Sequence, residues 1–122
     1  MRILVVDDSS TMRRIIANTL KKIGCEDIVE AGNGAEGLQH FRSGGIDFVV
    51  TDWNMPVMNG LEFVRELRGM EAAAKLPVLM VTTNAEIVDI AGAKEAGVSD
   101  YVVKPFTVET LKDKMTALIG AM

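Results

Sequence analysis

The chain has 122 residues, of which 48% are hydrophobic and 25% are charged, as is typical of one soluble globular domain. Thirteen basic and seventeen acidic residues give a formal net charge of −4, which argues against nucleic-acid binding and leaves proteins or small molecules as partners. Cys25 and His40 are each the only residue of their kind, so a disulfide framework, a zinc site and a Ser/His/Asp triad are poorly supported.

The first elements are a strand, a helix and a second strand. Ile3 to Val6 is an apolar run that predicts a strand buried on both faces. Ser9 and Ser10 are candidate caps of the following helix, which Gly24 ends. Asp27 to Ala31 predicts a more polar strand at the edge of a sheet. The apolar face of the helix is predicted to carry Met12, Ile15, Ile16, Leu20 and Ile23.

A short helix precedes the central strand. It follows the turn at residues 32–34, contains Ala35, Leu38 and Phe41, and closes at residues 43–45. Phe48 to Val50 then predicts a strand buried on both faces, and Asp52 lies where that strand ends. Turn residues at positions 56, 59 and 60 lead into another helix. Its apolar markers are Leu61, Val64 and Leu67.

The last third predicts two further strand and helix pairs. Val78 to Val81 is an apolar strand, and the helix predicted from Asn84 to Ala96 has mainly Ile90 and alanines to bury, so it should be weakly anchored. Tyr101 to Val103 is the fifth strand, and Thr107 is a candidate cap of the last helix. That helix is predicted to bury Val108, Leu111, Met115, Leu118 and Ile119.

Alternating strands and helices predict an α/β fold with a parallel sheet covered on both faces. We expect a (βα)5 flavodoxin-like doubly wound sheet with strand order 2-1-3-4-5, which makes the first and third strands neighbours. The carboxyl ends of the strands then share one edge of the sheet. Reactive groups follow or end four of them: Asp7 and Asp8, Asp52, Thr82, and Lys104.

This edge has the groups needed for phosphoryl transfer to an aspartate. Three carboxylates repel one another unless a cation compensates, and oxygen ligands suit Mg²⁺. In this reading Asp52 attacks phosphorus, Mg²⁺ and Lys104 neutralise the phosphoryl oxygens, and Thr82 donates a hydrogen bond. Each residue alone is explained as a cap or a turn residue; their joint placement at four strand ends favours the chemistry.

The motifs at these strand ends resemble those of a response-regulator receiver domain. The matching stretches are residues 5–10, 51–56 with Gly60, 81–82 and 104–106, and the resemblance covers essentially the whole chain. Within that family, residues 9–14, 52–53 and 101–106 are similar to single-domain chemotaxis regulators. The resemblance implies one receiver domain over residues 1–122, with no output domain.

It also implies roles for individual residues. Asp52 is the phosphoacceptor, Lys104 contacts the phosphoryl group, and Lys104-Pro105 is a cis peptide. Thr82 and Tyr101 form a switch pair, and the choice of Thr82 over Thr83 rests on the resemblance alone. The Mg²⁺ ligands are Asp7, Asp8, Asp52 and the backbone carbonyl of Asn54. Asn54 and Asn84 are expected to tune self-dephosphorylation.

The resemblance further implies partners. A histidine kinase donates the phosphoryl group, a phosphatase is a further partner, and a flagellar motor switch protein or another protein is the target. We expect a cytoplasmic monomer that binds no membrane and catalyses only its own phosphorylation and dephosphorylation. Glu86 and Ile87 stand where many such proteins have a basic pair, a departure that bears on the target. The partner face is expected around Ala85, Tyr101, Val103 and Lys114.

Other functions fit the same fold. A phosphorelay intermediate would pass the phosphoryl group to a histidine phosphotransfer protein. A Mg²⁺-dependent aspartyl-phosphate phosphatase usually needs a second aspartate where this chain has Asn54. A flavin carrier is disfavoured because acidic strand ends repel the FMN phosphate. An unphosphorylated scaffold would leave the acidic, threonine and lysine set unused.

Overall fold

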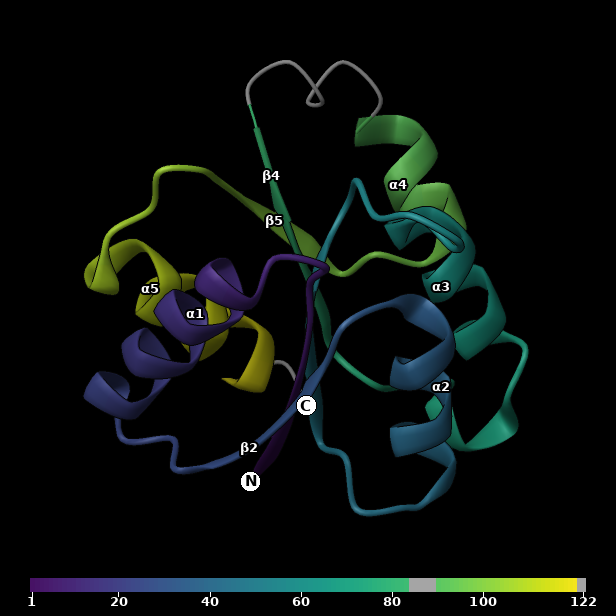
Figure 1. Cartoon of the computed structure of the whole chain (residues 1–122), viewed down its shortest axis with the longest axis horizontal. Coiled ribbons are helices and arrows are strands. Elements are labelled where there is room, and N and C mark those ends of the chain that lie inside the picture. Colours follow the sequence, from purple (N-terminus) through teal and green to yellow (C-terminus); the bar gives the residue numbers. More distant parts are fainter. Residues whose placement is uncertain (84–89, 121–122) are drawn as a thin grey trace.

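The structure is a computed structural model, and it describes residues 1–83 and 90–120. Within these residues, five parallel strands form one sheet in the order β2-β1-β3-β4-β5. The predicted α/β flavodoxin-like fold and its strand order are therefore confirmed (Figure 1). The strands are β1 Arg2–Val6, β2 Asp27–Ala31, β3 Phe48–Asp52, β4 Val78–Thr82 and β5 Asp100–Val103. The helices are α1 Ser10–Ile23, α2 Gly34–Arg42, α3 Gly60–Arg68, the 3₁₀-helix η1 Glu71–Ala73, α4 Ile90–Ala96 and α5 Val108–Gly120.

Helices cover both faces of the sheet, and each face has its own apolar core. On one face α1 and α5 pack over the sheet, and on the other α2, α3 and α4 do so (Figure 1). Successive strand residues alternate between the two cores: Ile3 and Val5 face α1 and α5, whereas Leu4 and Val6 face the other helices. The apolar runs in the sequence follow from this double burial. No helix in residues 1–83 and 90–120 is long and apolar enough to cross a membrane.

The predicted helix caps are present. The Ser9 side chain accepts a hydrogen bond from the Met12 N–H, and Gly24 ends α1 in the left-handed conformation at φ 104°. The Thr107 hydroxyl accepts from the Thr110 N–H at the start of α5. Asn59 also caps α3, in a reciprocal arrangement with Glu62. These bonds satisfy backbone N–H groups that a helix end leaves unpaired.

Two predicted core residues are exposed. Ile15 is 47% exposed because Ile16 and Leu20, four residues apart, set the buried stripe of α1, and Ile15 lies to one side of it. Val108 is also exposed, since as the first residue of α5 it has no preceding turn of helix to cover it. The predicted start of the fourth helix at Asn84, together with Ala85, Glu86 and Ile87, lies outside the described residues.

The loop between β3 and α3 contains one strained residue. Val57 has φ 70°, and the Met58 N–H donates to the Pro56 carbonyl at 2.7 Å across it. This is a γ-turn with positive φ, which is rare and unfavourable for a β-branched residue. The Val57 side chain is 88% exposed, so little packing offsets the strain.

Val57→Asn is therefore expected to stabilise the protein, because asparagine tolerates positive φ better than valine does. The expected gain in the free energy of unfolding is about 1 kcal/mol. Urea denaturation followed by circular dichroism measures it. Val108→Asn is the matched control, since Val108 is exposed but has no positive φ. A gain at position 108 equal to that at position 57 would exclude backbone strain as the cause.

Candidate functional site

The strand register brings the predicted reactive residues to one edge of the sheet. Val6 pairs with Thr51, Asp52 with Val81, and Thr82 with Val103, so these strands end at nearly the same level. Asp7 and Lys104 are the next residues after β1 and β5. Positions far apart in the sequence therefore lie together because all the strands are parallel.

Asp7, Asp8 and Asp52 form an acidic cluster. Each offers a carboxylate oxygen, and these oxygens lie within 4.8 Å of one another. Asp7 is 1% exposed and Asp52 is 6% exposed, whereas Asp8 faces solvent. The Lys104 ammonium lies 3.1 Å from Asp52 Oδ1 and 4.0 Å from Asp7 Oδ2. Among the described residues, three carboxylates thus lie together with the Lys104 ammonium, so acidic groups outnumber the basic one.

Asp7 carries the clearest sign of a cation site. Its Oδ1 accepts a hydrogen bond from the Ser9 N–H at 2.9 Å, but its buried Oδ2 has no hydrogen-bond partner among residues 1–83 and 90–120. The pKa of Asp7 is raised to about 6, mainly by burial and less by the charges of Asp52 and Asp8, while the hydrogen bond from Ser9 and the charge of Lys104 act in the opposite direction. A buried oxygen beside two more carboxylates is a donor set that fits Mg²⁺.

Trp53 and Lys104 both donate to the Asp52 carboxylate. Its Oδ1 accepts from the Trp53 N–H at 2.8 Å and from the Lys104 ammonium at 3.1 Å. Gly60 N–H donates to the Trp53 carbonyl at 2.7 Å, and a Cβ at position 60 would collide with the Asp52 carbonyl oxygen. Glycine is therefore required where α3 starts beside the end of β3. Asn54, the predicted backbone ligand, is exposed in the same loop.

Thr82 and Tyr101 lie on the same face of the sheet. Thr82 pairs with Val103 and Met80 pairs with Tyr101, so Thr82 and Tyr101 are diagonal neighbours on adjacent strands. Thr82 is buried, and its hydroxyl donates to the Thr83 carbonyl at 3.3 Å, whereas Thr83 is exposed. Tyr101 is partly buried against the core under α2, α3 and α4. The two residues of the predicted switch pair thus lie close together on adjacent strands, and their coupling stays a prediction.

Of the predicted partner face, Tyr101, Val103 and Lys114 are described and Ala85 is not. All three are partly buried. The Lys114 ammonium lies 3.2 Å from Asp100 Oδ2 and 5.3 Å from the centre of the Tyr101 ring. Lys114 therefore connects α5 to the tyrosine of the predicted switch pair.

Arg13 belongs to the site, although the pattern of the sequence places it on the outer face of α1. Its Nη1 donates to the Asp7 carbonyl at 2.6 Å, and its Nε donates to Glu30 Oε1 at 3.2 Å. The register offers a signal for this contact, because Glu30 pairs with Val5 near the end of β1. That signal requires knowledge of the strand pairing.

Mg²⁺ is expected to change the fluorescence of Trp53, which is the only tryptophan in the chain. The backbone N–H of Trp53 donates to the Asp52 carboxylate. A change in charge at that carboxylate therefore occurs one residue away from the indole. A titration of the wild-type protein measures the effect, with Asp7→Asn as the control that removes a ligand. An unchanged emission spectrum at saturating Mg²⁺ would count against the site.

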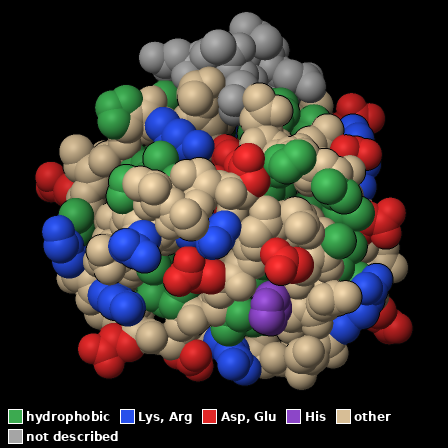
Figure 2. All heavy atoms as spheres, in the orientation of Figure 1, with side chains coloured by type: hydrophobic (Ala, Val, Ile, Leu, Met, Phe, Trp, Pro, Cys, Tyr) green, Lys and Arg blue, Asp and Glu red, His purple; other side chains and the backbone are tan. Residues whose placement is uncertain are grey.

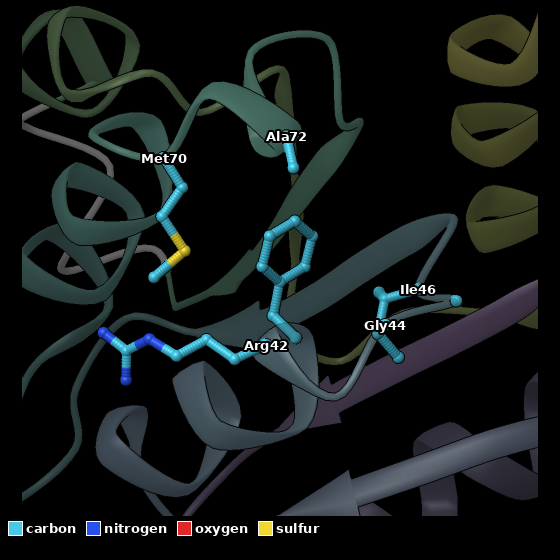
Figure 3. A pocket seen from close by; sticks show the side chains of 7 residues that line it. Arg42, Gly44, Ile46, Met70 and Ala72 are labelled. Carbon is cyan, nitrogen blue, oxygen red and sulfur yellow. The ribbon is translucent and has the colours of Figure 1, made fainter.

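A hollow lies at the opposite edge of the sheet, where α2 ends and β3 has not yet begun. Its volume is about 380 Å³, and it is lined by Phe41, Arg42, Gly44, Gly45, Ile46, Met70 and Ala72 (Figure 3). Its lining combines one guanidinium with mainly apolar side chains and backbone. On the face shown in Figure 2, acidic and basic side chains are interspersed. Neither feature competes with the carboxyl edge as the site of chemistry.

Comparisons with known proteins agree with this geometry. Residues 3–116 match the model of the response regulator receiver domain family. The chemotaxis protein CheY of Pseudomonas aeruginosa is 51% identical over 115 residues, which are 94% of this chain and 93% of that protein. The structure of chemotaxis protein CheY4 of Vibrio cholerae has a TM-score of 0.89 at 33% identity, covering 96% of this chain and 97% of that one.

A third similar structure contains a metal ion. The receiver domain of a sensor histidine kinase of Pseudomonas aeruginosa has a TM-score of 0.88 at 27% identity, covering 98% of this chain and 97% of that one. That structure has a magnesium ion coordinated in its active-site cleft. The comparison thus links a similar fold to the cation that the acidic cluster fits.

Proposed function

The chain belongs to the family of response regulator receiver domains, and we propose that it is a cytoplasmic chemotaxis response regulator phosphorylated on Asp52. A histidine kinase supplies the phosphoryl group, and the modified protein binds a flagellar motor switch protein. The observation that carries this proposal is the pairing of a buried Asp52 carboxylate with the Lys104 ammonium, 3.1 Å away, beside two more carboxylates. An aspartate nucleophile and a cation for the phosphoryl oxygens are thus already adjacent.

In the proposed reaction, an Asp52 carboxylate oxygen attacks the phosphorus of a phosphohistidine. The new P–O bond forms as the P–N bond breaks, and the departing imidazole nitrogen takes up a proton from water. Lys104 transfers its contact from Asp52 Oδ1 to a phosphoryl oxygen, and the Trp53 N–H keeps the carboxylate oriented. Asp7, Asp8, Asp52 and the Asn54 carbonyl would hold Mg²⁺, which when bound would supply further positive charge to the phosphoryl oxygens.

The proposed output begins at Thr82. Its hydroxyl, bonded to the Thr83 carbonyl in the unphosphorylated protein, turns to donate to a phosphoryl oxygen. The space it leaves on the α4 side of the sheet admits Tyr101, which changes the face formed with Val103 and Lys114. The diagonal placement of Thr82 and Tyr101 supports this coupling. Two packings that differ by a few kcal/mol are enough for such a switch.

The test is binding of a flagellar motor switch protein to the free and the beryllofluoride-loaded protein, measured by isothermal titration calorimetry. Tighter binding to the loaded form, with no response in Asp52→Asn, is expected. A parallel assay incubates the phosphorylated protein with histidine phosphotransfer proteins. Transfer of the phosphoryl group to such a protein, with no change in target binding, would replace the proposal with the phosphorelay alternative.

A further inference from the structure

Arg13 joins three elements beneath the acidic cluster. It extends from the first turns of α1, its Nη1 donates to the carbonyl of Asp7 at the end of β1, and its Nε lies 3.2 Å from Glu30 on β2. The bond to Asp7, at 2.6 Å, is short because the donor is charged. Arg13 is partly buried, whereas Glu30 is exposed.

This contact completes the set of bonds that fixes Asp7. The Asp7 N–H donates to the Ala31 carbonyl at 3.1 Å, and Asp7 Oδ1 accepts from the Ser9 N–H at 2.9 Å. Of the bonds to Asp7 just named, only the one from Arg13 comes from a side chain. With backbone and Oδ1 held in this way, the buried Oδ2 is directed to the side where Lys104 lies, 4.0 Å away.

We propose that Arg13, held by Glu30, is a positioning residue for the metal site. It fixes the end of β1 so that the carboxylates of Asp7 and Asp8 are preset to bind the cation. The inference rests on the proposed function, in which that cation is Mg²⁺. Arg13 acts through geometry, because its charge is already paired with Glu30 and its hydrogen bond is to a backbone carbonyl. Outer contacts of this kind orient the ligands of metal sites.

The guanidinium suits this task. Its Nε and Nη1 point in fixed directions, so a single side chain serves Glu30 and the Asp7 carbonyl together. Lysine has one ammonium and replaces the bond to Asp7 without the rigid fork. Methionine keeps an unbranched apolar stem and loses every donor. The two substitutions therefore separate packing from hydrogen bonding.

The experiment titrates Mg²⁺ into full-length variants and follows Trp53 fluorescence, together with amide hydrogen exchange of Ser9 in the metal-free protein. Arg13→Met is expected to weaken Mg²⁺ binding about tenfold and to speed exchange of the Ser9 amide. Arg13→Lys is expected to recover part of the affinity. Glu30→Gln should weaken binding less, by at most about fivefold. Arg14→Met, at an exposed neighbouring position, is the matched control and should bind as the wild type does.

Two outcomes overturn the inference: Mg²⁺ affinity in Arg13→Met equal to that of the wild type, or an equal loss in Arg14→Met. If Arg13→Met fails to fold, Arg13→Lys and Glu30→Gln carry the same test, and wild-type affinity in both overturns it. A wild type that shows no response to Mg²⁺ contradicts the proposed function instead. In that case the Ser9 exchange rates still decide whether Arg13 positions the end of β1.

Discussion

Asp52→Asn is expected to keep the fold and to reduce phosphoryl incorporation from acetyl phosphate to background. The amide has no nucleophilic oxygen of comparable strength, so the attack on phosphorus is lost. The side chain keeps its size, and its carbonyl oxygen still accepts from the Trp53 N–H and the Lys104 ammonium. Circular dichroism and intact mass measure the two parts of this result.

The matched control for this substitution is Asp113→Asn, which makes the same chemical change on the exposed side of α5. That variant should incorporate phosphate at the wild-type level. Undiminished incorporation in Asp52→Asn would move the acceptor to another residue.

Asp7→Asn is expected to raise the free energy of unfolding at pH 7 in the absence of Mg²⁺. The Asp7 carboxylate is buried, lies beside two like charges and has an oxygen without a hydrogen-bond partner in the part of the chain that the structure describes. The neutral amide removes the repulsion, keeps an acceptor for Ser9, and offers an N–H₂ group to the neighbouring carboxylates. The rise in pKa from 3.8 to about 6 corresponds to a gain of roughly 2–3 kcal/mol.

The pH dependence has a definite sign. Because the folded state binds the Asp7 proton more tightly than the unfolded state does, this group lowers stability as the pH rises from about 4 to about 6. Above that range the cost is complete, and below it the cost is absent. Thermal melts of the wild type and Asp7→Asn between pH 4 and pH 7 measure the difference. The two curves should converge at the acid end, and a parallel offset at all pH values would contradict this origin.

The same thermal melts are repeated in the presence of Mg²⁺. The cation binds the folded wild type and should raise its melting temperature at pH 7, while Asp7→Asn should show little gain. Asp8→Asn is the comparison, because Asp8 belongs to the same cluster but faces solvent. Its stability without Mg²⁺ should change much less than that of Asp7→Asn. Equal changes at the two positions would exclude burial as the cause.

Much of the fold follows from patterns visible in the sequence. The inner strands β1, β3 and β4 are buried on both sides and the helices have one apolar face. The helix caps are local, so Ser9, Gly24 and Thr107 mark helix ends as expected. The meeting of Asp7, Asp8 and Asp52 also follows from the strand order. The alternation of elements predicts a parallel sheet, and the doubly wound order of such sheets is the one that makes β1 and β3 neighbours.

The remaining features depend on packing that no local pattern contains. Whether Ile15 or Ile16 faces the sheet is set by the rotation of α1, and both fit a helical period. The γ-turn at Val57 cannot be predicted from the sequence, because valine is an unfavourable residue for positive φ. The sequence pattern predicts that Arg13 lies on the outer face of α1. Its contact with Glu30 follows from the position of β2, which the pattern of the helix does not contain. The metal and phosphate roles of the site residues stay predictions.

The most direct test of the central claim is the intact mass of the wild-type protein after incubation with acetyl phosphate, taken rapidly under acidic conditions. The predicted result is the mass of one added phosphoryl group when Mg²⁺ is present, and none when it is absent. Beryllofluoride binding, followed by Trp53 fluorescence, serves as the check if rapid hydrolysis removes the product. No added mass together with no beryllofluoride binding would contradict phosphorylation of Asp52 and leave a receiver fold without receiver chemistry.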